Sequence, residues 1–443
     1  MFLRIVLLPY LLFLPLHASL LAVRLANAPD LGWEVWSPAV LFLSILLVTY
    51  LALRFSDYRG SPAVPSLVLA LLGVGIAIQY RIGTLRTVEI SSPSQLALPI
   101  GVVVMIATYL LLRHGRINKL EPFWSVFLGA SVLVIALVLI LGHAFRGAFF
   151  LAGGINPVEI IKPMMIVAIA TFLAGHRLLL RRSFLGIPLP PLNILTTVAI
   201  VWAAPMFLLL AQGDMGMFAL MNITLLVMLY AVTNRSLYLI GGIAAIIAAA
   251  RFLIPLTARG RARLIVWTDP FQQATGTGWQ PLQALVALYQ GGFWGTGLGS
   301  GSPNVVPIVE SDFAYIIIGE ELGFLGCGAI ILLFCSLIFS GMRIASRAEG
   351  AYAACIATGI TACIGIQTLF NIGGVVKAIP LTGITLPLLS HGGSSLVTTL
   401  FMTGLLLAIS DERLPKKQAA DKQKSRSGKA PAANSSARSR KTP

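Results

Sequence analysis

Seven ionisable side chains stand apart from the basic clusters of this sequence, within or at the ends of long apolar stretches. They are Glu159, Lys162, Asp214, Asp312, Glu320, Glu321 and Lys377. Asp312 is the leading candidate for chemistry, because it lies where a long segment rich in glycine and aromatic residues enters an apolar run. A carboxylate at such a rim can act as a general base when partial burial raises its pKa towards the working pH. We therefore expect Asp312 to transfer a proton.

Two of these groups also have simpler structural interpretations. Asp312 could cap the helix that follows it, since a carboxylate accepts bonds from the first free N–H groups of a helix. Glu159 and Lys162 are three residues apart, so they would share a helix face and could pair internally. Pro157 and Pro163 bracket the pair and predict an irregular backbone, which membrane proteins tolerate mainly where it lines a cavity. We expect the pair to line a cavity, with the self-contained ion pair as the alternative.

Other polar groups give weaker signals. Glu320 and Glu321 lie about two turns into the same apolar run, and we interpret them as structural. His391 stands in a Gly- and Ser-rich cluster before the last apolar run and is interpreted as a satisfied polar group. The sequence holds no His, Cys or carboxylate cluster with metal-site spacing and no Gly-rich loop that ends in Lys-Ser/Thr, so neither a structural metal nor nucleotide hydrolysis is indicated.

The elements that must position these side chains are membrane helices. With 57% hydrophobic and only 11% charged residues in 443, the chain cannot wrap a soluble core in a polar surface. A bilayer crossing needs roughly 20 apolar residues, and such runs recur with short connections between them. The sequence predicts an all-α polytopic membrane protein with about 12 transmembrane helices, at 2–22, 36–54, 65–83, 95–113, 122–142, 156–180, 191–211, 215–232, 236–254, 312–342, 349–372 and 387–409.

The basic residues predict the orientation of these helices. Every second connection carries Lys or Arg, beginning with Arg54 and Arg59, and such connections face the cytoplasm. Both termini are therefore expected inside. From Asp411 onwards, ten basic residues against three acidic ones give a net charge of +7, which predicts a disordered, soluble cytoplasmic tail over 411–443. The overall net charge of +16 is not gathered on a foldable domain, so a nucleic-acid partner is not expected.

One connection is much longer than the rest. Residues 255–311 fall on the predicted outer side and are too aromatic for a disordered segment. Within this extracytoplasmic loop, 281–290 read as a short amphipathic helix with Leu282, Leu285, Val286 and Tyr289 on one face. We expect this helix to lie along the outer membrane interface.

Several segments, taken in order, resemble one family. Residues 379–395 read Ile-Pro-Leu-Thr-Gly-Ile-Thr-Leu-Pro-Leu-Leu-Ser-His-Gly-Gly-Ser-Ser, and Ser311-Asp312-Phe313 runs on to Gly319-Glu320-Glu321-Leu322-Gly323. Asn156-Pro157-Val158-Glu159 with Lys162, Gln212-Gly213-Asp214-Met215-Gly216, Trp279-Gln280 and Gly295-Thr296-Gly297-Leu298-Gly299 extend the match over roughly residues 65–409. Together they resemble the SEDS family of shape, elongation, division and sporulation proteins, to which RodA and FtsW belong.

The resemblance implies a glycosyltransferase that links lipid II into peptidoglycan outside the bacterial cytoplasmic membrane, beside a class B penicillin-binding protein. It places the essential acid at Asp312 and a cavity-lining pair at Glu159 and Lys162. It also implies a core of ten helices over 61–410, preceded by two additional helices in 1–60. The expected substrate-binding set is Glu159, Lys162, Gln212, Asp214, Arg146, Ser394 and Ser395.

The mechanism that this resemblance suggests is an inverting transfer. Asp312 would accept a proton from the acceptor hydroxyl while undecaprenyl pyrophosphate leaves the donor. Lys162, with Arg146 or a divalent cation such as Mg²⁺ or Mn²⁺, would offset the charge of the leaving group.

The sequence departs from the family pattern at three places, of which the segment around Gly147 and the residue Gly154 bear on how the anionic donor is held. His391 stands where tyrosine is usual, Gly154 where a basic residue is common, and the segment around Gly147 lacks the usual tryptophan or basic–aromatic pair. Two other classes of function stay open on the sequence alone. A lipid II flippase or other transporter also needs many helices and buried acids. A non-catalytic scaffold would only recruit the cross-linking partner.

Overall fold

The structure is a computed structural model, and it describes residues 2–27, 36–83, 93–145, 148–150, 156–181, 192–307 and 309–411. Arg146 and residues 412–443, which hold the predicted substrate contact and nearly all of the predicted tail, lie outside the described residues.

Twelve apolar helices make up most of the described residues, against about 12 transmembrane helices predicted from the sequence. Within the described residues, nine are long enough to cross a membrane and three more, at Leu96–Leu112, Thr196–Gln212 and Ser236–Phe252, are shorter apolar helices. The bounds are α1 (Phe2–Asn27), α2 (Ser37–Phe55), α3 (Ala63–Ile82), α4 (Pro93–Leu112), α5 (Trp124–Leu141), α6 (Val158–Gly175), α8 (Leu192–Gln212), α9 (Met215–Thr233), α10 (Ser236–Leu253), α13 (Ala314–Arg347), α14 (Ala351–Val375) and α15 (Gly393–Asp411).

Short elements join these helices. An antiparallel strand pair, β1 (His143–Phe145) and β2 (Ala148–Phe150), follows α5, and the one-turn helix α7 (Arg177–Leu180) follows α6. The remaining short turns are 3₁₀ helices: η2 (Arg116–Phe123), η3 (Ile254–Leu256), η4 (Pro270–Gln273) and η5 (Pro303–Val305). The strand pair was not predicted from the sequence.

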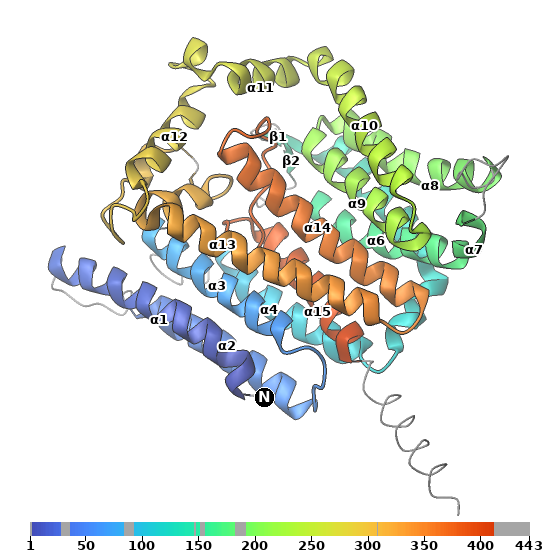
Figure 1. The fold of residues 1–443 in the computed structure, drawn as a ribbon, viewed down its shortest axis with the longest axis horizontal. Helices are drawn as coiled ribbons and strands as arrows, with labels where there is room; N and C mark the ends of the chain where they lie inside the picture. Colours follow the sequence, from blue (N-terminus) through green and yellow to red (C-terminus); the bar gives the residue numbers. More distant parts are fainter. Residues whose placement is uncertain are drawn as a thin grey trace, which may run out of the picture.

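The long connection between α10 and α13 is mostly helical. It holds α11 (Ala258–Thr268) and α12 (Trp279–Gly291), and these form an arch over one end of the bundle (Figure 1). The predicted helix at 281–290 is therefore confirmed. The face of α12 that packs on protein holds Ala284 and Ala287, whereas Val286 and Tyr289 of the predicted apolar face are exposed.

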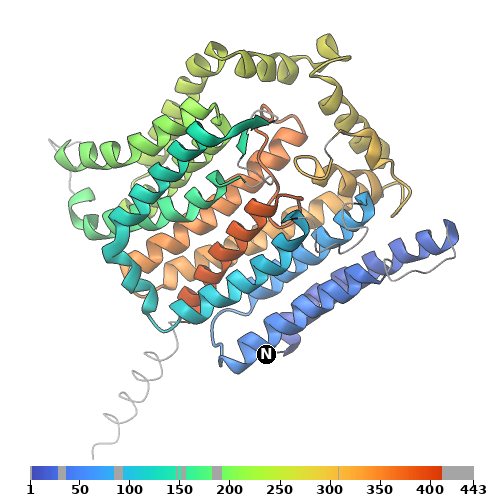
Figure 2. The ribbon, with the colours of Figure 1, turned by 180° about the vertical axis from the view of Figure 1, so that it is seen from behind.

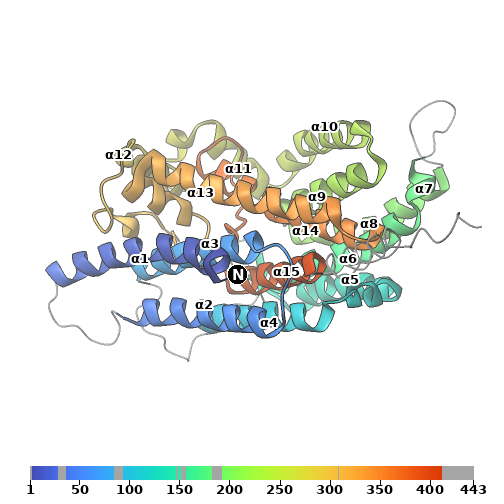
Figure 3. The ribbon, with the colours of Figure 1, turned by 60° about the horizontal axis from the view of Figure 1, so that its bottom comes forward.

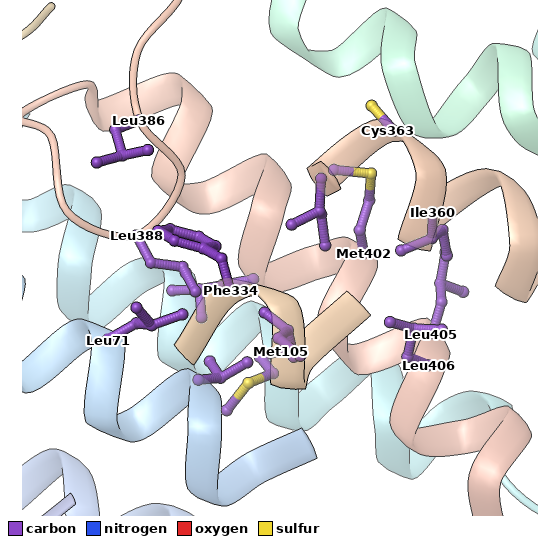
Figure 4. Close-up of a cluster of buried hydrophobic side chains, with 14 of the residues drawn as sticks. Leu71, Met105, Phe334, Ile360, Cys363, Leu386, Leu388, Met402, Leu405 and Leu406 are labelled. Carbon is purple, nitrogen blue, oxygen red and sulfur yellow. The ribbon is translucent and has the colours of Figure 1, made fainter. Parts of the chain in front are cut away.

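The core is centred on α14 and α15. Helix α14 packs against α6, α9 and α13, and α15 lies along α4. This packing can be followed from the opposite side in Figure 2. Small residues permit the close approach of α4 and α15, because a Cβ atom on Gly404 would lie 2.5 Å from the carbonyl oxygen of Met105. Figure 4 shows the apolar side chains that fill this region, among them Leu71, Met105, Phe334, Ile360, Met402 and Leu405.

The first two helices lie at the edge of the bundle. Helix α1 packs along α3, and α2 contacts α3 and α4 (Figure 3). Phe13 of α1 stacks on Phe42 of α2 with ring centroids 4.1 Å apart. Helices α1 and α2 are therefore attached to the bundle by apolar and aromatic contacts.

Helix α13 is broken at Gly323. Residues 292–297, which follow α12, supply hydrogen-bond partners for the backbone groups at the break. Gly323 has φ 65° and ψ −162°, a backbone conformation that is essentially restricted to glycine. Phe324 N donates to Gly292 O at 2.9 Å, and Thr296 N donates to Glu320 O at 2.9 Å. The backbone groups released by the break are thus satisfied, as a membrane interior requires.

Glu320 and Glu321 bind the backbone of the residues that follow α12, which agrees with their structural interpretation. Glu321 accepts from Arg81 Nε at 2.8 Å and from Gly299 N at 2.9 Å, and Glu320 accepts from Ser302 N at 2.7 Å. Both carboxylates are buried, so their charge is offset by Arg81 and by backbone N–H groups.

We expect Gly323→Ala to destabilise the protein by about 2–3 kcal/mol, because alanine is strained in this conformation and its Cβ would lie only 2.6 Å from Phe293 O. Thermal unfolding of the purified protein in detergent measures the effect. Gly328→Ala on the same helix is the control, since a Cβ there meets nothing within 4 Å. Equal melting temperatures for the two variants would contradict this account of the break.

Candidate functional site

Two buried amides on α14 organise the site. Gln367 and Asn371 are four residues apart and therefore lie on one helix face. Gln367 Nε2 donates to Thr385 O at 3.0 Å and to Ser395 Oγ at 3.2 Å. Asn371 Nδ2 donates to Ile384 O at 2.8 Å and to Asp312 O at 2.9 Å. These amides hold residues 376–392, here called the connecting segment, between α14, α15 and the start of α13.

Glu159 and Lys162 form an ion pair on the first turns of α6. The Lys162 side chain is fully buried, and Nζ also donates to Gln367 Oε1 at 2.8 Å. The predicted irregular backbone is wrong: α6 runs without interruption through Pro163, and Pro157 stands at its N-cap. The bond from Lys162 to Gln367 joins α6 to α14, so both charges of the pair have partners within the protein.

Asp312 lies at the rim where α13 begins. The helix starts at Ala314, and the residue at its N-cap is Phe313, which makes no side-chain cap. Asp312 is therefore one residue outside the N-cap position. Asp312 is partly open to solvent, while its backbone carbonyl is fixed by a hydrogen bond from Asn371.

Arg263 of α11 reaches the same place. A Cβ atom built on Gly383 would lie 3.5 Å from Arg263 Nη2 and 3.9 Å from Asp312 Oδ2. The guanidinium and the carboxylate therefore face the same small space above Gly383, which itself adopts φ +75°. Arg263 Nη1 donates to Thr382 O at 3.2 Å and so keeps α11 against the connecting segment.

The connecting segment is fixed at its other end as well. His391 N donates to Glu310 O at 2.7 Å, and Gln79 Nε2 donates to both Glu310 O and Leu389 O. Burial lowers the pKa of His391, while the nearby Glu310 raises it by a smaller amount. The backbone of His391 thus holds the segment that leads into α13, and the interpretation of its imidazole as a satisfied polar group stays a prediction.

Gln212 and Asp214 occupy structural positions between α8 and α9. Gln212 Nε2 donates to Ile135 O of α5 at 3.2 Å, and Asp214 caps α9 by accepting from Met217 N at 2.9 Å. Burial raises the pKa of Asp214, although the Met217 bond lowers it; Glu159 raises it further, and the charges of Arg263 and Lys162 lower it. The charges of Glu159, Lys162 and Arg263 are consequently close enough to Asp214 to change its pKa.

Ser394 and Ser395 are also bonded within the protein. Ser394 Oγ accepts from Asn156 N at 3.0 Å, just before α6. Ser395 Oγ lies 3.0 Å from Thr385 Oγ1. Both serines tie the start of α15 to its neighbours. Their predicted contact with substrate stays a prediction.

Sequence reasoning passed over several residues of this site. Gln367 and Asn371 are detectable as polar residues at helical spacing inside an apolar run. Lys377 is among the seven ionisable residues singled out from the sequence, but its proximity to Arg263 carries no such signal, because the two residues belong to segments far apart in the sequence. They line a cavity of about 320 Å³ between α11, α12 and the end of α14, together with Trp267, Thr277, Gln280 and Leu381.

The described residues contain no group of three or more His, Cys, Asp or Glu side chains arranged to hold a metal ion. Asp312 faces a guanidinium across Gly383. The divalent cation considered from the sequence therefore stays a prediction without an assigned set of protein ligands.

Together the fold and site define a multi-pass helical membrane protein with a carboxylate at the rim of a polar, buried network. A family model described as "Cell cycle protein", for FtsW, RodA and SpoVE, matches residues 62–414. The chain belongs to this family, as the resemblance of its motifs indicated. The matched residues begin after α2.

Relatives and solved structures agree with this assignment. The peptidoglycan glycosyltransferase RodA of Mycobacterium tuberculosis is 30% identical over 411 residues, covering 89% of this chain and 87% of the relative. The rod shape determining protein RodA of Thermus thermophilus has a similar fold, with a TM-score of 0.58 at 23% identity over 80% of this chain and 98% of that one. A chain from a study of "polymerization and crosslinking by a peptidoglycan synthase complex" gives 0.64 at 23% identity, over 81% and 99%.

We expect Lys162→Met to destabilise the protein by about 3–5 kcal/mol, because it leaves Glu159 buried without its partner. The double variant Glu159→Gln, Lys162→Met removes both charges and should recover most of the loss. Thermal unfolding of the single and double variants measures this coupling. A double variant as unstable as Lys162→Met would show that the pair is not the principal interaction of these residues.

Proposed function

We propose that the chain polymerises lipid II into glycan strands as an inverting peptidoglycan glycosyltransferase. Family membership and the name of the M. tuberculosis relative support the reaction class. The observation that carries the proposal is Asp312: its carboxylate is partly exposed at the rim, its backbone is locked by Asn371, and Arg263 faces the same space.

The proposed chemical step is a single displacement. Asp312 accepts the proton of the acceptor hydroxyl while the oxygen attacks the anomeric carbon of the donor. A glycosidic bond forms, the bond to the pyrophosphate oxygen breaks, and undecaprenyl pyrophosphate leaves with the bonding electron pair. The rigid backbone around Asp312 supports this role, since a misplaced base loses much of its catalytic effect.

The proposed orientation places Asp312 and the arch of α11 and α12 on the outer face of the bacterial cytoplasmic membrane, with both termini inside. The basic connections support it, because Arg54, Arg113, Arg177, Arg235 and Arg343 lie at or near the ends of helices whose following connections are expected inside. Lipid-linked sugars are accessible from the same outer face in this arrangement.

A class B penicillin-binding protein is the proposed partner. The support is the fold shared with a chain whose study concerns coordinated polymerisation and crosslinking by a peptidoglycan synthase complex.

Asp312→Asn should reduce polymerisation by at least about a hundredfold, since loss of a general base typically removes a factor of that size or more. The assay is gel analysis of glycan strands made from lipid II by the purified protein in nanodiscs, with and without the candidate partner. Asp269→Asn, an amide replacement at another carboxylate between α10 and α13, is the control and should retain wild-type activity.

Other outcomes separate the alternatives. Wild-type yield from Asp312→Asn would remove Asp312 from the base role. If the wild type and the Asp312→Asn variant both move labelled lipid II between leaflets and neither makes polymer, the result would favour a flippase. A wild type that binds the partner and makes no polymer under any of these conditions would favour a scaffold.

A further inference from the structure

The approach to Asp312 is held by two donors that meet on one carbonyl. Glu310 O accepts from His391 N at 2.7 Å and from Gln79 Nε2 at 3.2 Å. Gln79 Nε2 also donates to Leu389 O at 3.1 Å, so one amide of α3 binds both the connecting segment and the residues before α13. Glu310 precedes Asp312 by two residues. The position of the carboxylate therefore depends on this junction.

His391 stands at this junction with a side chain that can take up a proton. It lines a cavity of about 50 Å³ between α3, α4 and α15, together with Gln79 and Ser390. A cavity of this size, edged by an amide and a hydroxyl, has room for water. His391 is itself partly exposed. Protons from the solvent can therefore reach the imidazole ring.

In the described part of the chain, one charged side chain acts on the imidazole of His391. Burial lowers the pKa of the imidazole, and the charge of Glu310 raises it by a smaller amount. The helices around the cavity present uncharged side chains, which are Gln79 from α3, Leu98 from α4 and Leu396 from α15. A histidine whose pKa lies below the ordinary 6.5 is neutral at neutral pH and becomes charged in acid.

Protonation of His391 works against the junction. The folded protein favours the neutral imidazole, because burial lowers the pKa of His391 below its value in an unfolded chain. The stability that depends on the neutral form is therefore fully present above the unfolded pKa and is lost as the pH falls through the folded pKa. The family pattern has tyrosine at this position, and a phenol carries no charge over the same range. Acid sensitivity at the junction thus follows from the histidine that replaces it.

We propose that His391 is a positioning residue for Asp312 and acts through Glu310. The neutral imidazole leaves the junction closed, so the carboxylate of Asp312 stays in place. The imidazolium draws the Glu310 carboxylate, no longer tolerates burial and loosens the junction. This inference rests on the proposed function, in which Asp312 is the general base. Polymerisation then falls in acid for two reasons, the protonation of Asp312 itself and the loosening of its approach.

The first measurement is the pH dependence of polymerisation by the full chain in nanodiscs, with lipid II as substrate. The rates of wild type, His391→Tyr and His391→Gln are each expressed relative to the same protein at neutral pH. One pH unit below the pKa of His391, the relative rate of wild type should be about tenfold lower than that of either variant, because only about one molecule in ten then holds a neutral imidazole. The two variants are uncharged and differ in size, so agreement between them excludes an effect of packing.

The second measurement needs no turnover. Hydrogen exchange of residues 309–317, read by mass spectrometry in the same nanodiscs, reports how firmly the approach to α13 is held. Wild type and His391→Tyr should exchange alike at neutral pH, and wild type should exchange faster than His391→Tyr in acid. Each comparison is made at a single pH, so the intrinsic pH dependence of exchange cancels.

The role of Glu310 is tested by a titration of His391. The chain has five histidines, and His391→Tyr identifies the His391 signal in the nuclear magnetic resonance spectrum of protein labelled with ¹³C at histidine. Glu310→Gln should lower the pKa of His391, since it removes the charge that raises this pKa. Glu349→Gln, a matched change at the other end of α13, should leave the pKa of His391 unchanged.

Equal pH profiles, or equal exchange in acid, for wild type and the His391 variants would overturn the positioning role. So would a pKa of His391 that Glu310→Gln does not move, because the effect could not then pass through Glu310. A wild type that shows the acid-induced exchange at residues 309–317 and makes no polymer at any pH would refute the proposed function and leave the pH-sensitive junction standing.

Discussion

The structure depends on the satisfaction of polar groups inside an apolar molecule. The side-chain amides of Gln367 and Asn371 donate to backbone carbonyls of the connecting segment, and Asn371 also donates to the carbonyl of Asp312. Gln367 Oε1 accepts a hydrogen bond from the Lys162 ammonium. In a membrane interior, an irregular segment without such partners would leave backbone carbonyls unsatisfied at a cost of several kcal/mol each. Two amides on one helix therefore make it possible for non-helical backbone to lie in the centre of the bundle.

The same requirement explains how the outer arch is attached. Helix α13 breaks at Gly323, and residues 292–297 provide the partners that the broken helix lacks. Glu320 and Glu321 then hold the next turn of the arch, and Arg81 links it to α3. The arch is thus bonded into the bundle at its C-terminal end, while Arg263 and Trp267 bond its first helix to the connecting segment. This double attachment places the cavity next to Asp312.

Charges in this protein divide into two sets with different surroundings. The Glu159–Lys162 and Arg81–Glu321 pairs are closed within the fold and gain their stability from partners that are always present. Arg263, Lys377 and Asp312 border space that a substrate can enter. Buried pairs cost much to break and contribute little to binding, whereas partly exposed groups keep their charge available. Of these two sets, only the second is open enough to support the proposed chemistry at Asp312.

The sequence by itself determined the all-helical membrane fold, the short helix at 281–290 and the candidate carboxylate, because apolar runs and local motifs are read from neighbouring residues. It was wrong about an irregular start of α6, since Pro157 at the N-cap and Pro163 within are accommodated by a continuous helix. Only the tertiary structure decided the partners of Asp312. Arg263, Asn371 and Gly383 lie 49, 59 and 71 residues from Asp312 along the chain. Their meeting depends on how α11, α14 and the connecting segment pack, which no local pattern encodes.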